Sequence, residues 1–477
     1  MPDQEKRSID EIMEDLQRIN QEFRERVRDG FKNPDDFIKL SEIEKMGREL
    51  SLNTQKLYLE ETTSLLNDID ESLLIRKKKT EYKEKGINLT PSQLEARNIT
   101  TINGVVSIFR RRLRPVNKES KALLLKTEGV KSIAPLDCFL GIDKLPFKMT
   151  AAAMLECAYW AQDQVSFQRA EEKIKRTLHI SIDDDTIRKA AGYIGKAVFE
   201  EDCRKADEAW AEFCKRPLVL EPKRKKGVLY IETDGSSVNT RIQDENGSTW
   251  RENKLAIFFS TDHIYKWKNK KGEICRKIEK KEYVSYLGSV SEFKKHVLAG
   301  AIRNGYGRYE KVVLLSDGAG WIANMKDELF GEDALQILDF FHLSENVYSY
   351  GKAKFKMNES QYIPWADEKC KKLRDGKWKE VLGELDPEET YKNTVNLYHY
   401  INSNKEHIDY PQYSAMGLFI GSGAIESSNK IIVQRRFKQA GMRWGVSTAQ
   451  YLMTLVSKWE SELWESDVVN RTYKILN

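Results

Sequence analysis

The chain has 477 residues, of which 40% are apolar and 10% aromatic, so it is long enough to bury a sizeable core. At roughly 150 residues per domain, this length corresponds to about three domains or to one enlarged catalytic core. Small numbers of Gly, Pro and Cys (27, 11 and 6) exclude collagen-like, mucin-like and disulfide-scaffold proteins. Lys and Arg exceed Asp and Glu by 79 to 74, and a net charge of only +5 makes the local charge distribution more informative than the total.

No segment is typical of secretion or of membrane insertion. Residues 1–10 lack the apolar core of a secretory signal. The best membrane candidate, residues 150–161, is interrupted by Glu156 after about half the length that a span requires. The six cysteines are scattered, without C-x-x-C or zinc-type spacing. These features predict a soluble, reduced, cytoplasmic protein.

Residues 1–90 predict a helical N-terminal arm. Apolar residues recur every three or four positions in three stretches, which cover residues 9–27, 40–50 and 65–73. Ser8 and Glu11 have the spacing of a capping box at the start of the first stretch. The arm either packs on the body or mediates dimerisation; the absence of a sustained heptad favours packing.

Residues 91–147 predict a β-hairpin followed by a linker. Asn103-Gly104 is a strong turn signal, and apolar residues flank it within the expected hairpin, residues 97–114. The second strand contains four arginines in five residues, among them the candidate DNA contacts Arg110, Arg111 and Arg112. An edge strand protected from aggregation by charge would show the same pattern, so both interpretations stay open.

Residues 148–221 predict a helical region with a helix-turn-helix. One helix covers residues 166–178, a turn covers 179–182, and a second helix begins near Asp184. Arg188 and Lys189 lie on the outward face of the second helix, where a recognition helix would contact DNA. Helical hairpins without a DNA role share this pattern and are more frequent.

Residues 222–343 predict the first part of an α/β core. The segment begins with a basic stretch, residues 222–227, which predicts a linker, and continues with predicted strands. The expected strands cover residues 228–233, 254–261, 282–287, 312–315 and 335–338. Helices separate the third strand from the fourth and the fourth from the fifth. Three antiparallel strands followed by this alternation predict an α/β core with the ribonuclease-H-like order, in which the first and fourth strands are neighbours. Residues 344–404 are mostly helical, and residues 416–477 form C-terminal helices.

Three carboxylates carry the predicted chemistry. Asp234 and Asp317 follow the first and fourth strands, and Glu426 lies one turn into a helix that begins after Gly421-Ser422-Gly423. Each alone is an ordinary turn or helix-start residue. Together they would repel one another by roughly 4 kcal/mol per pair at about 4 Å, unless protonated or bound to cations. Oxygen ligands indicate Mg²⁺ or Mn²⁺, and two such ions can flank a phosphodiester.

Two basic segments suit a polyanionic substrate. Residues 265–282 contain eight Lys or Arg and three acids, and residues 430–443 contain five basic residues and no acid. The second set consists of Lys430, Arg435, Arg436, Lys438 and Arg443. Because this set directly follows Glu426, it is a candidate DNA-binding surface, with phosphate contacts supplying affinity.

Four sequence blocks together resemble the DDE transposases of bacterial insertion sequences, most closely the ISLre-type family. The blocks are Tyr230–Gly235, Leu315–Ile322, Leu338–Leu343 and Gly421–Ser427, and the segment Gly441–Trp444 is similar too. The resemblance covers roughly residues 130–460.

This resemblance implies a transposase with Asp234, Asp317 and Glu426 as the catalytic, metal-binding triad. Residues 344–415 would be the helical insertion that many such enzymes carry before their glutamate. Asp339 and His342 would lie beside the site, with His342 either catalytic or a structural strand cap.

The expected function is therefore metal-dependent DNA cleavage and strand transfer by a nucleoid-associated enzyme. Its partners would be the inverted-repeat ends of its own element and target DNA, and joining two ends implies at least a dimer. A nuclease of the same fold and a DNA-binding protein without strand transfer are the alternatives. Trp365 and Trp378 either stack on an unpaired base near a cut end or, as we favour, pack the helical segment.

Overall fold

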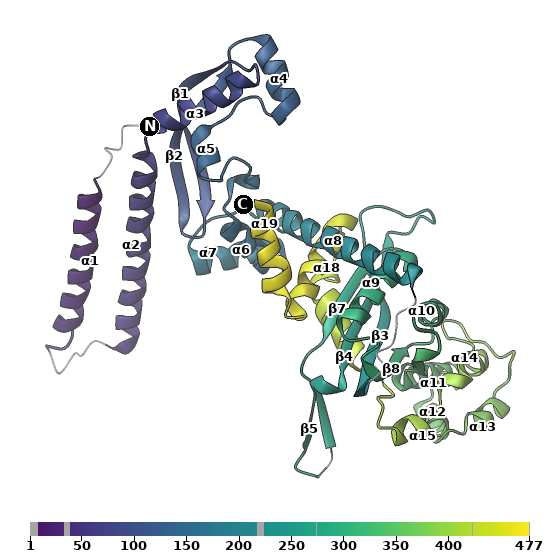
Figure 1. Cartoon of the computed structure of the whole chain (residues 1–477). Coiled ribbons are helices and arrows are strands. Elements are labelled where there is room, and N and C mark those ends of the chain that lie inside the picture. Colours follow the sequence, from purple (N-terminus) through teal and green to yellow (C-terminus); the bar gives the residue numbers. More distant parts are fainter. Residues whose placement is uncertain (1–7, 33–38, 217–223, 273, 422, 477) are drawn as a thin grey trace. The chain divides into compact units, whose positions relative to one another are not determined.

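The structure is a computed structural model that describes residues 8–32, 39–216, 224–272, 274–421 and 423–476 (Figure 1). The chain divides into two compact units. Unit 1 comprises Met1–Ala161, Ser166–Ala191 and Thr472–Asn477, and unit 2 comprises Gln162–Val165 and Gly192–Arg471. No described helix combines the length and the apolar character that crossing a membrane requires.

Unit 1 starts with the helices α1 (Ile9–Asp29) and α2 (Leu40–Asn67), which lie side by side and bury Ile12, Leu16 and Leu57 between them (Figure 1). The predicted capping box is confirmed: Ser8 Oγ accepts a hydrogen bond from the Glu11 amide, and the Glu11 carboxylate accepts one from the Ser8 amide.

The third predicted helical stretch, residues 65–73, is wrong because a turn divides it. Helix α2 ends at Asn67, and Asp70 caps the start of α3 (Glu71–Glu84) by accepting a hydrogen bond from the Ser72 amide at 2.9 Å. A side chain that satisfies free amides at a helix start competes with continuation of the preceding helix.

The predicted β-hairpin is confirmed and is longer than expected. Strands β1 (Leu89–Thr101) and β2 (Gly104–Pro115) pair antiparallel on either side of the Ile102–Asn103 turn. One part of the hairpin buries Ile99, Val106 and Ile108 with Leu136 of α5 (Pro135–Phe139). Helix α4 (Lys118–Glu128) covers another part through Leu124.

The predicted helix–turn–helix pattern is present as α7 (Phe167–Leu178) and α8 (Asp184–Lys215). His179 ends α7 in the left-handed conformation, with φ of 57°. Helix α8 is 32 residues long and contributes residues to both units, so it is far longer than the short second helix that we expected. The 3₁₀ turn η1 (Pro146–Lys148) and helix α6 (Ala151–Asp163) precede this pair.

Unit 2 is a mixed α/β unit built on a five-stranded sheet with the order β7-β4-β3-β8-β9. The central strand β3 pairs antiparallel with β4 and parallel with β8, while β4 pairs antiparallel with β7 and β8 parallel with β9. The strands are β3 (Lys225–Asn239), β4 (Trp250–Ser260), β7 (Glu282–Leu287), β8 (Tyr309–Ser316) and β9 (Ala334–Leu338).

The two faces of this sheet are covered differently. Alternate residues such as Leu229 and Ile231 point to one face, where α9 (Val290–Arg303) and α10 (Gly320–Phe330) complete an apolar core. Glu232 and Asp234 therefore belong to the opposite face, against which α16 (Gly423–Asn429) packs. The alternation along β3 thus places Glu232 and Asp234 opposite the α9–α10 core, on a face where the buried Tyr230 also lies.

The rest of unit 2 is largely helical, as predicted for residues 344–404. Besides α16, the helices between β9 and the end of α18 are α11 (Phe340–Lys354), α12 (Glu359–Arg374), α13 (Trp378–Gly383), α14 (Leu397–Ser403), α15 (Tyr410–Ala415), the π-helical turn η5 (Lys430–Gln434), α17 (Arg435–Phe437) and α18 (Val446–Glu460). The π-helical turn η6 (Trp464–Val469) and helix α19 (Asn470–Leu476) follow. Most residues of α19 belong to unit 1. Short 3₁₀ turns η2 (Thr261–His263), η3 (Gly331–Asp333) and η4 (Lys405–His407) connect elements.

Two predictions about strands are wrong. The first strand does not end at Thr233: β3 continues to Asn239 because residues beyond Asp234 still pair with β4, for example Asp234 with Leu255. The predicted linker is also strand from Lys225 onward, whereas Pro222 and Lys223 lie outside the described residues. The sequence prediction also missed β5 (Ile264–Lys268) and β6 (Ile274–Ile278), which form a separate hairpin.

Candidate active site

Three aspartates lie at neighbouring positions of three parallel strands, Asp234 within β3 and Asp317 and Asp339 directly after β8 and β9. Glu232 pairs with Leu315 across β3 and β8, so the register places Asp234 opposite Asp317 two positions further on. Ser316 pairs with Leu338 across β8 and β9, so Asp317 and Asp339 occupy the next positions. The predicted neighbourhood of the first and fourth strands is confirmed, although Asp234 lies within β3 and not at its end.

Helix α16 carries Glu426 to the same face of the sheet. The Ile425 amide donates a hydrogen bond to Glu232 Oε2 at 2.9 Å, and Asn429 Nδ2 donates one to Asp234 Oδ2. Both contacts join α16 to β3, one immediately before Glu426 and the other one turn after it. They fix the helix that presents Glu426.

Glu426 forms a group with Asp339 and His342. One ligand atom from each of these three residues lies within 4.8 Å of the other two. His342 Nε2 is 3.6 Å from Asp339 Oδ2, and its Nδ1 is 3.5 Å from Glu345 Oε2. Of the three predicted ligands, Asp234 and Asp317 are thus neighbours across β3 and β8, whereas Glu426 groups with Asp339 and His342, which were expected beside the site.

Burial and mutual repulsion shape the electrostatics of these carboxylates. Burial, together with the charges of Asp339 and Glu426, raises the pKa of Glu232 to about 8 against the opposing effects of the Ile425 amide and Lys281. Burial also raises the pKa of Asp234, as does the charge of Asp317, against the opposing effects of the Gly235 amide, His342 and Asn429. A cation would stabilise the charged forms of these acids.

Two glycines of the sequence blocks have steric roles beside this site. Gly318 follows Asp317 with φ of +85°, a conformation that L residues rarely adopt, in the turn from β8 to α10. A Cβ at Gly421 would lie 2.4 Å from the Phe341 ring, so glycine lets the segment before α16 approach α11 closely. The Asp317 carboxylate is held by the Ala319 amide at 2.9 Å.

The sequence prediction missed three residues that position the site. Glu232 lies two residues before Asp234 and Asn429 three after Glu426, so strand and helix periods contained a signal for both. Tyr400, on α14, donates a hydrogen bond to the Asp317 carbonyl at 2.6 Å. Its separation of 83 residues from Asp317 left no local pattern to find.

The arginines predicted to bind DNA in β2 differ from one another in the structure. Arg110 is buried: its Nε donates to Asp137 Oδ1 at 3.2 Å and its Nη1 to the Glu95 carbonyl at 2.9 Å. The prediction that Arg110 contacts DNA is therefore wrong, because its guanidinium holds the hairpin together. Arg112 is half-buried, whereas Arg111 is exposed, 3.7 Å from Glu71.

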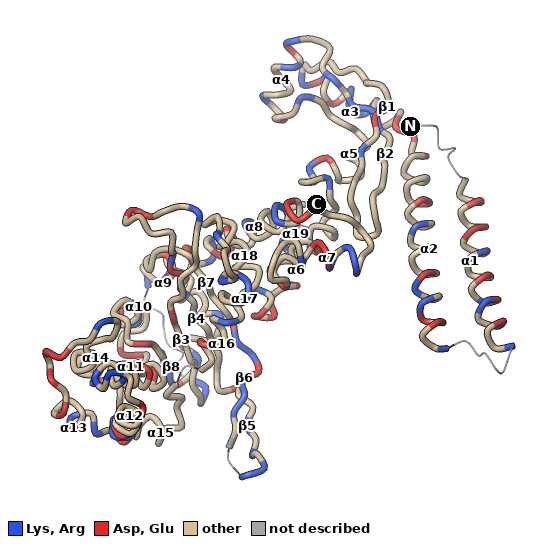
Figure 2. The backbone as a smooth tube through the Cα atoms, turned by 180° about the vertical axis from the view of Figure 1, so that it is seen from behind, with Lys and Arg blue, Asp and Glu red and all other residues tan. Residues whose placement is uncertain are grey.

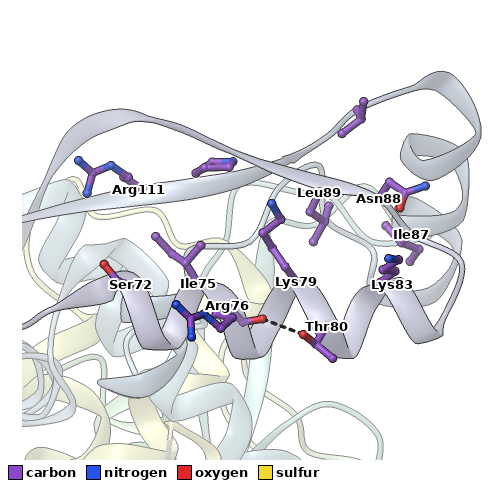
Figure 3. Close-up of a pocket in the computed structure, with 12 residues that line it drawn as sticks. Ser72, Ile75, Arg76, Lys79, Thr80, Lys83, Ile87, Asn88, Leu89 and Arg111 are labelled. Carbon is purple, nitrogen blue, oxygen red and sulfur yellow. Dashed lines mark hydrogen bonds between the residues drawn. The ribbon is translucent and has the colours of Figure 1, made fainter.

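Arg111 lines a groove of about 880 Å³ between α3 and the hairpin (Figure 3). Arg76, Lys79 and Lys83 lie along the side of α3 that lines this groove, at helical spacings of three and four residues. Leu89 and Ile87 form part of the apolar lining. The groove thus combines four basic side chains with an apolar surface.

The remaining predicted DNA contacts are mostly exposed. Arg188 and Lys189 both pair with Asp185, at 2.6 and 2.5 Å, on the surface of α8. The exposed members of the segment after Glu426 are Lys430, Arg435, Lys438 and Arg443.

Arg436 is the exception, and its predicted DNA contact is wrong. It is 2% exposed, lies 4.9 Å from the Trp444 ring and donates to the Val165 carbonyl, and burial lowers its pKa to about 10.

Trp365 packs the helical segment, as we favoured. Its ring lies 5.8 Å from Tyr350 in a stacked arrangement and 6.0 Å from Phe355. Trp378 begins α13 and is half-buried, with Lys379 over its ring.

Comparisons with known proteins give one distant similarity. The chain is 21% identical over 437 residues to the UPF0236 protein in vanSb 3'region of Streptococcus gallolyticus. The alignment covers 89% of this chain and 84% of that protein. No protein-family profile matches the chain. The similarity extends over both units and is too low to establish a family.

Proposed function

We propose that the protein is a DNA transposase that cleaves the ends of its own element and joins them to target DNA. The observation that carries this proposal is the convergence of Asp234, Asp317 and Asp339 on adjacent strands, with Glu426 and His342 in the same group as Asp339. Carboxylates that lie this close repel one another unless they are protonated or bound to cations. Such a cluster is suited to metal-dependent phosphodiester chemistry.

The sheet supports the same proposal. Its order, with three antiparallel strands on one side of a parallel set, matches the order expected of a ribonuclease-H-like core. In our proposal the helices between β9 and α16 are the insertion that precedes the catalytic glutamate. The distant relative aligns with 89% of the chain, which is consistent with one shared architecture.

The donor set fits Mg²⁺ or Mn²⁺. Asp234, Asp317 and Glu426 would hold two ions, and Asp339 supplies a further carboxylate beside Glu426. Carboxylate oxygens are the ligands that these cations prefer. When bound, such ions would activate a water and stabilise charge on the scissile phosphate.

The residues of the chain itself would orient and exchange protons. His342 lies between Asp339 and Glu345, and we assign to its imidazole the exchange of a proton with substrate bound at the cluster. Glu232 and Asn429 keep α16 on the sheet and thereby hold Glu426 in place. Tyr400 fixes the backbone of Asp317.

The exposed cations provide surfaces for DNA. Arg111, Arg76, Lys79 and Lys83 line the groove of unit 1, and Arg435, Lys438 and Arg443 follow the catalytic helix in unit 2. Lys and Arg on such surfaces bind phosphates and release counterions. We propose the inverted-repeat ends and target DNA as partners, with at least a dimer when two ends are joined, in a nucleoid-associated cytoplasmic protein.

A strand-cleavage assay tests this function. Labelled DNA from both flanks of the reading frame is incubated with the protein and Mg²⁺, Mn²⁺ or EDTA, together with the variants Asp317→Asn and Glu426→Gln. We expect cuts at fixed positions that require the metal and disappear in both variants, while folding and DNA binding are retained. Glu310→Gln, an exposed acid on the same strand β8, is the matched control and should cut normally.

The alternatives predict other results. Cleavage without joining would identify a nuclease. Binding without cleavage in either metal would overturn the enzymatic proposal and favour a DNA-binding protein. A large loss of thermal stability in Glu426→Gln would contradict its assignment as a metal ligand, because the substitution removes one charge without changing shape.

A further inference from the structure

The β5–β6 hairpin is a small projection with no role in the catalytic cluster. Its strands pair only with each other, from Ile264–Ile278 to Lys268–Ile274, and form their own two-stranded sheet. Figures 1 and 2 show the hairpin extending beyond the end of β4, and basic residues mark much of its length. An isolated two-stranded hairpin is marginally stable by itself, so a retained one suggests a function at its surface.

The register separates the hairpin into two faces. Tyr265 and Trp267 lie on one face with their cross-strand partners Lys277 and Cys275. The two aromatic rings stack on each other at 5.9 Å with an interplanar angle of 18°, and the side chains are 55% and 40% exposed. Two stacked aromatic rings on an exposed ribbon form a flat apolar surface in water.

The opposite face anchors the hairpin to the core near the active site. The Arg276 guanidinium lies 5.3 Å from the centre of the Phe419 ring, which in turn packs on Tyr230 of β3 at 5.1 Å. Phe419 precedes the segment that enters α16, and the Ile420 carbonyl accepts a hydrogen bond from the Phe340 amide of α11 at 2.9 Å. The aromatic face is therefore the one that points away from this anchor.

The charge on the hairpin is uncompensated. Residues 265–282 contain eight Lys or Arg against three acids. Among the described residues, none of these eight forms a salt bridge, and seven of them (Lys266, Lys268, Lys270, Lys271, Arg276, Lys277 and Lys280) are exposed. Proteins that bind a single nucleic acid strand combine basic side chains, which contact the phosphates, with exposed aromatic rings, which stack on the bases.

We propose that the β5–β6 hairpin binds a DNA strand next to the cleavage site, with an unpaired base stacked on Tyr265 and Trp267 and the phosphates held by the surrounding lysines. This inference rests on the proposed function, since it assigns the hairpin to the separated strand at a cut end. A duplex offers phosphates and groove edges to a protein but keeps its base faces stacked, so an aromatic platform is useful only where a base is unpaired.

Equilibrium binding measured by fluorescence anisotropy tests the hairpin without relying on cleavage. Three labelled DNAs of one sequence are compared in EDTA: a single strand, a blunt duplex and a duplex with a single-stranded overhang. Trp267→Ala should weaken binding to the single strand and to the overhang roughly 5- to 150-fold, the range that stacking of one base on an aromatic ring contributes. Binding to the blunt duplex should change less than about twofold.

Matched variants separate stacking from charge and from folding. Trp250→Ala removes a 54% exposed tryptophan from β4 and should leave all three affinities unchanged, and Trp267→Phe should retain most of the single-strand affinity. Lys277→Gln, on the same face as the two rings, should lower the salt dependence of single-strand binding by about 0.7, the effect of one lost phosphate contact. Equal weakening of duplex and single strand by Trp267→Ala would overturn the stacking role, as would an unchanged single-strand affinity or no single-strand binding by the parent protein.

The binding test can contradict the hairpin proposal without contradicting the proposed transposase function, and the reverse also holds. Asp317→Asn should keep the single-strand affinity, because binding in EDTA needs no catalysis. If the protein stacks bases but never cuts DNA, the hairpin proposal stands and the transposase proposal is contradicted. If the variants Trp267→Ala and Tyr265→Ala cut DNA normally, the transposase proposal stands and the hairpin proposal is contradicted.

Discussion

Strand β2 and the β5–β6 hairpin look alike in sequence and differ in what their charges do. Both are β ribbons rich in Lys and Arg. In β2, carboxylates meet the basic side chains: Arg110 pairs with Asp137, Arg114 with Glu95, and Arg111 lies near Glu71. In the β5–β6 hairpin, no basic residue has a salt-bridge partner among the described residues.

The difference teaches that a basic run does not by itself indicate a binding surface, because burial and ion pairing decide which of its charges a ligand can reach. Asp137 is 27 residues away from Arg110 along the chain and also binds Arg97 of β1, so one buried carboxylate joins both strands. These ion pairs stabilise the β1–β2 hairpin. Among the described residues, no acid forms a salt bridge with the cations of β5–β6, so these cations remain available to a ligand.

Removing the shared carboxylate of β1 and β2 should have the largest effect on stability. Asp137→Ala leaves Arg97 and Arg110 without their buried partner, and breaking a buried ion pair costs about 3–5 kcal/mol. Denaturant unfolding and amide hydrogen exchange across β1 and β2 would measure this loss. The control Asp143→Ala removes an exposed acid nearby and should cost little. Equal stability of the two variants would show that the arginines of β2 are not held by Asp137.

Arg436 and Lys438 repeat the comparison within one short segment. Arg436→Ala should destabilise unit 2 by about 1–3 kcal/mol, because it exposes a gap beside Trp444 and leaves the Val165 carbonyl without its donor. Lys438→Ala, at an exposed position, should leave the thermal midpoint unchanged and lower the salt dependence of duplex binding by about 0.9. The opposite pattern would place Arg436 on the DNA and contradict its buried position.

The exposed ion pair between Arg114 of β2 and Glu95 of β1 should contribute least to stability. Arg114 is 59% exposed and its partner Glu95 is 34% exposed, and surface ion pairs contribute about 0–1 kcal/mol. Arg114→Ala should therefore shift the denaturant midpoint only slightly. A loss as large as that of Asp137→Ala would mean that exposure does not separate structural from available cations in this strand.

Much of the fold was predictable because it depends on local patterns. Apolar periodicity located α1 and the five strands of the main sheet, Asn103-Gly104 located the β1–β2 turn, and the capping box at Ser8 has the predicted form. The β3–β8 neighbourhood followed from the order of elements, and it brought Asp234 and Asp317 together. Errors were concentrated where tertiary pairing overrides a local signal: β3 continues through Asp234-Gly235 because β4 pairs with it.

The candidate site was only partly predictable for the same reason. The sequence by itself determined which carboxylates follow strands, where a glutamate begins a helix and which segments carry positive charge, because these depend on neighbours in the chain. Tertiary structure alone decided that Glu426 meets Asp339 and His342, that Tyr400 holds Asp317, and that Arg110 and Arg436 are buried while Trp267 is exposed. The physical reason is that burial and charge pairing arise between residues tens to hundreds of positions apart, which only the packed sheet and its helices bring into contact.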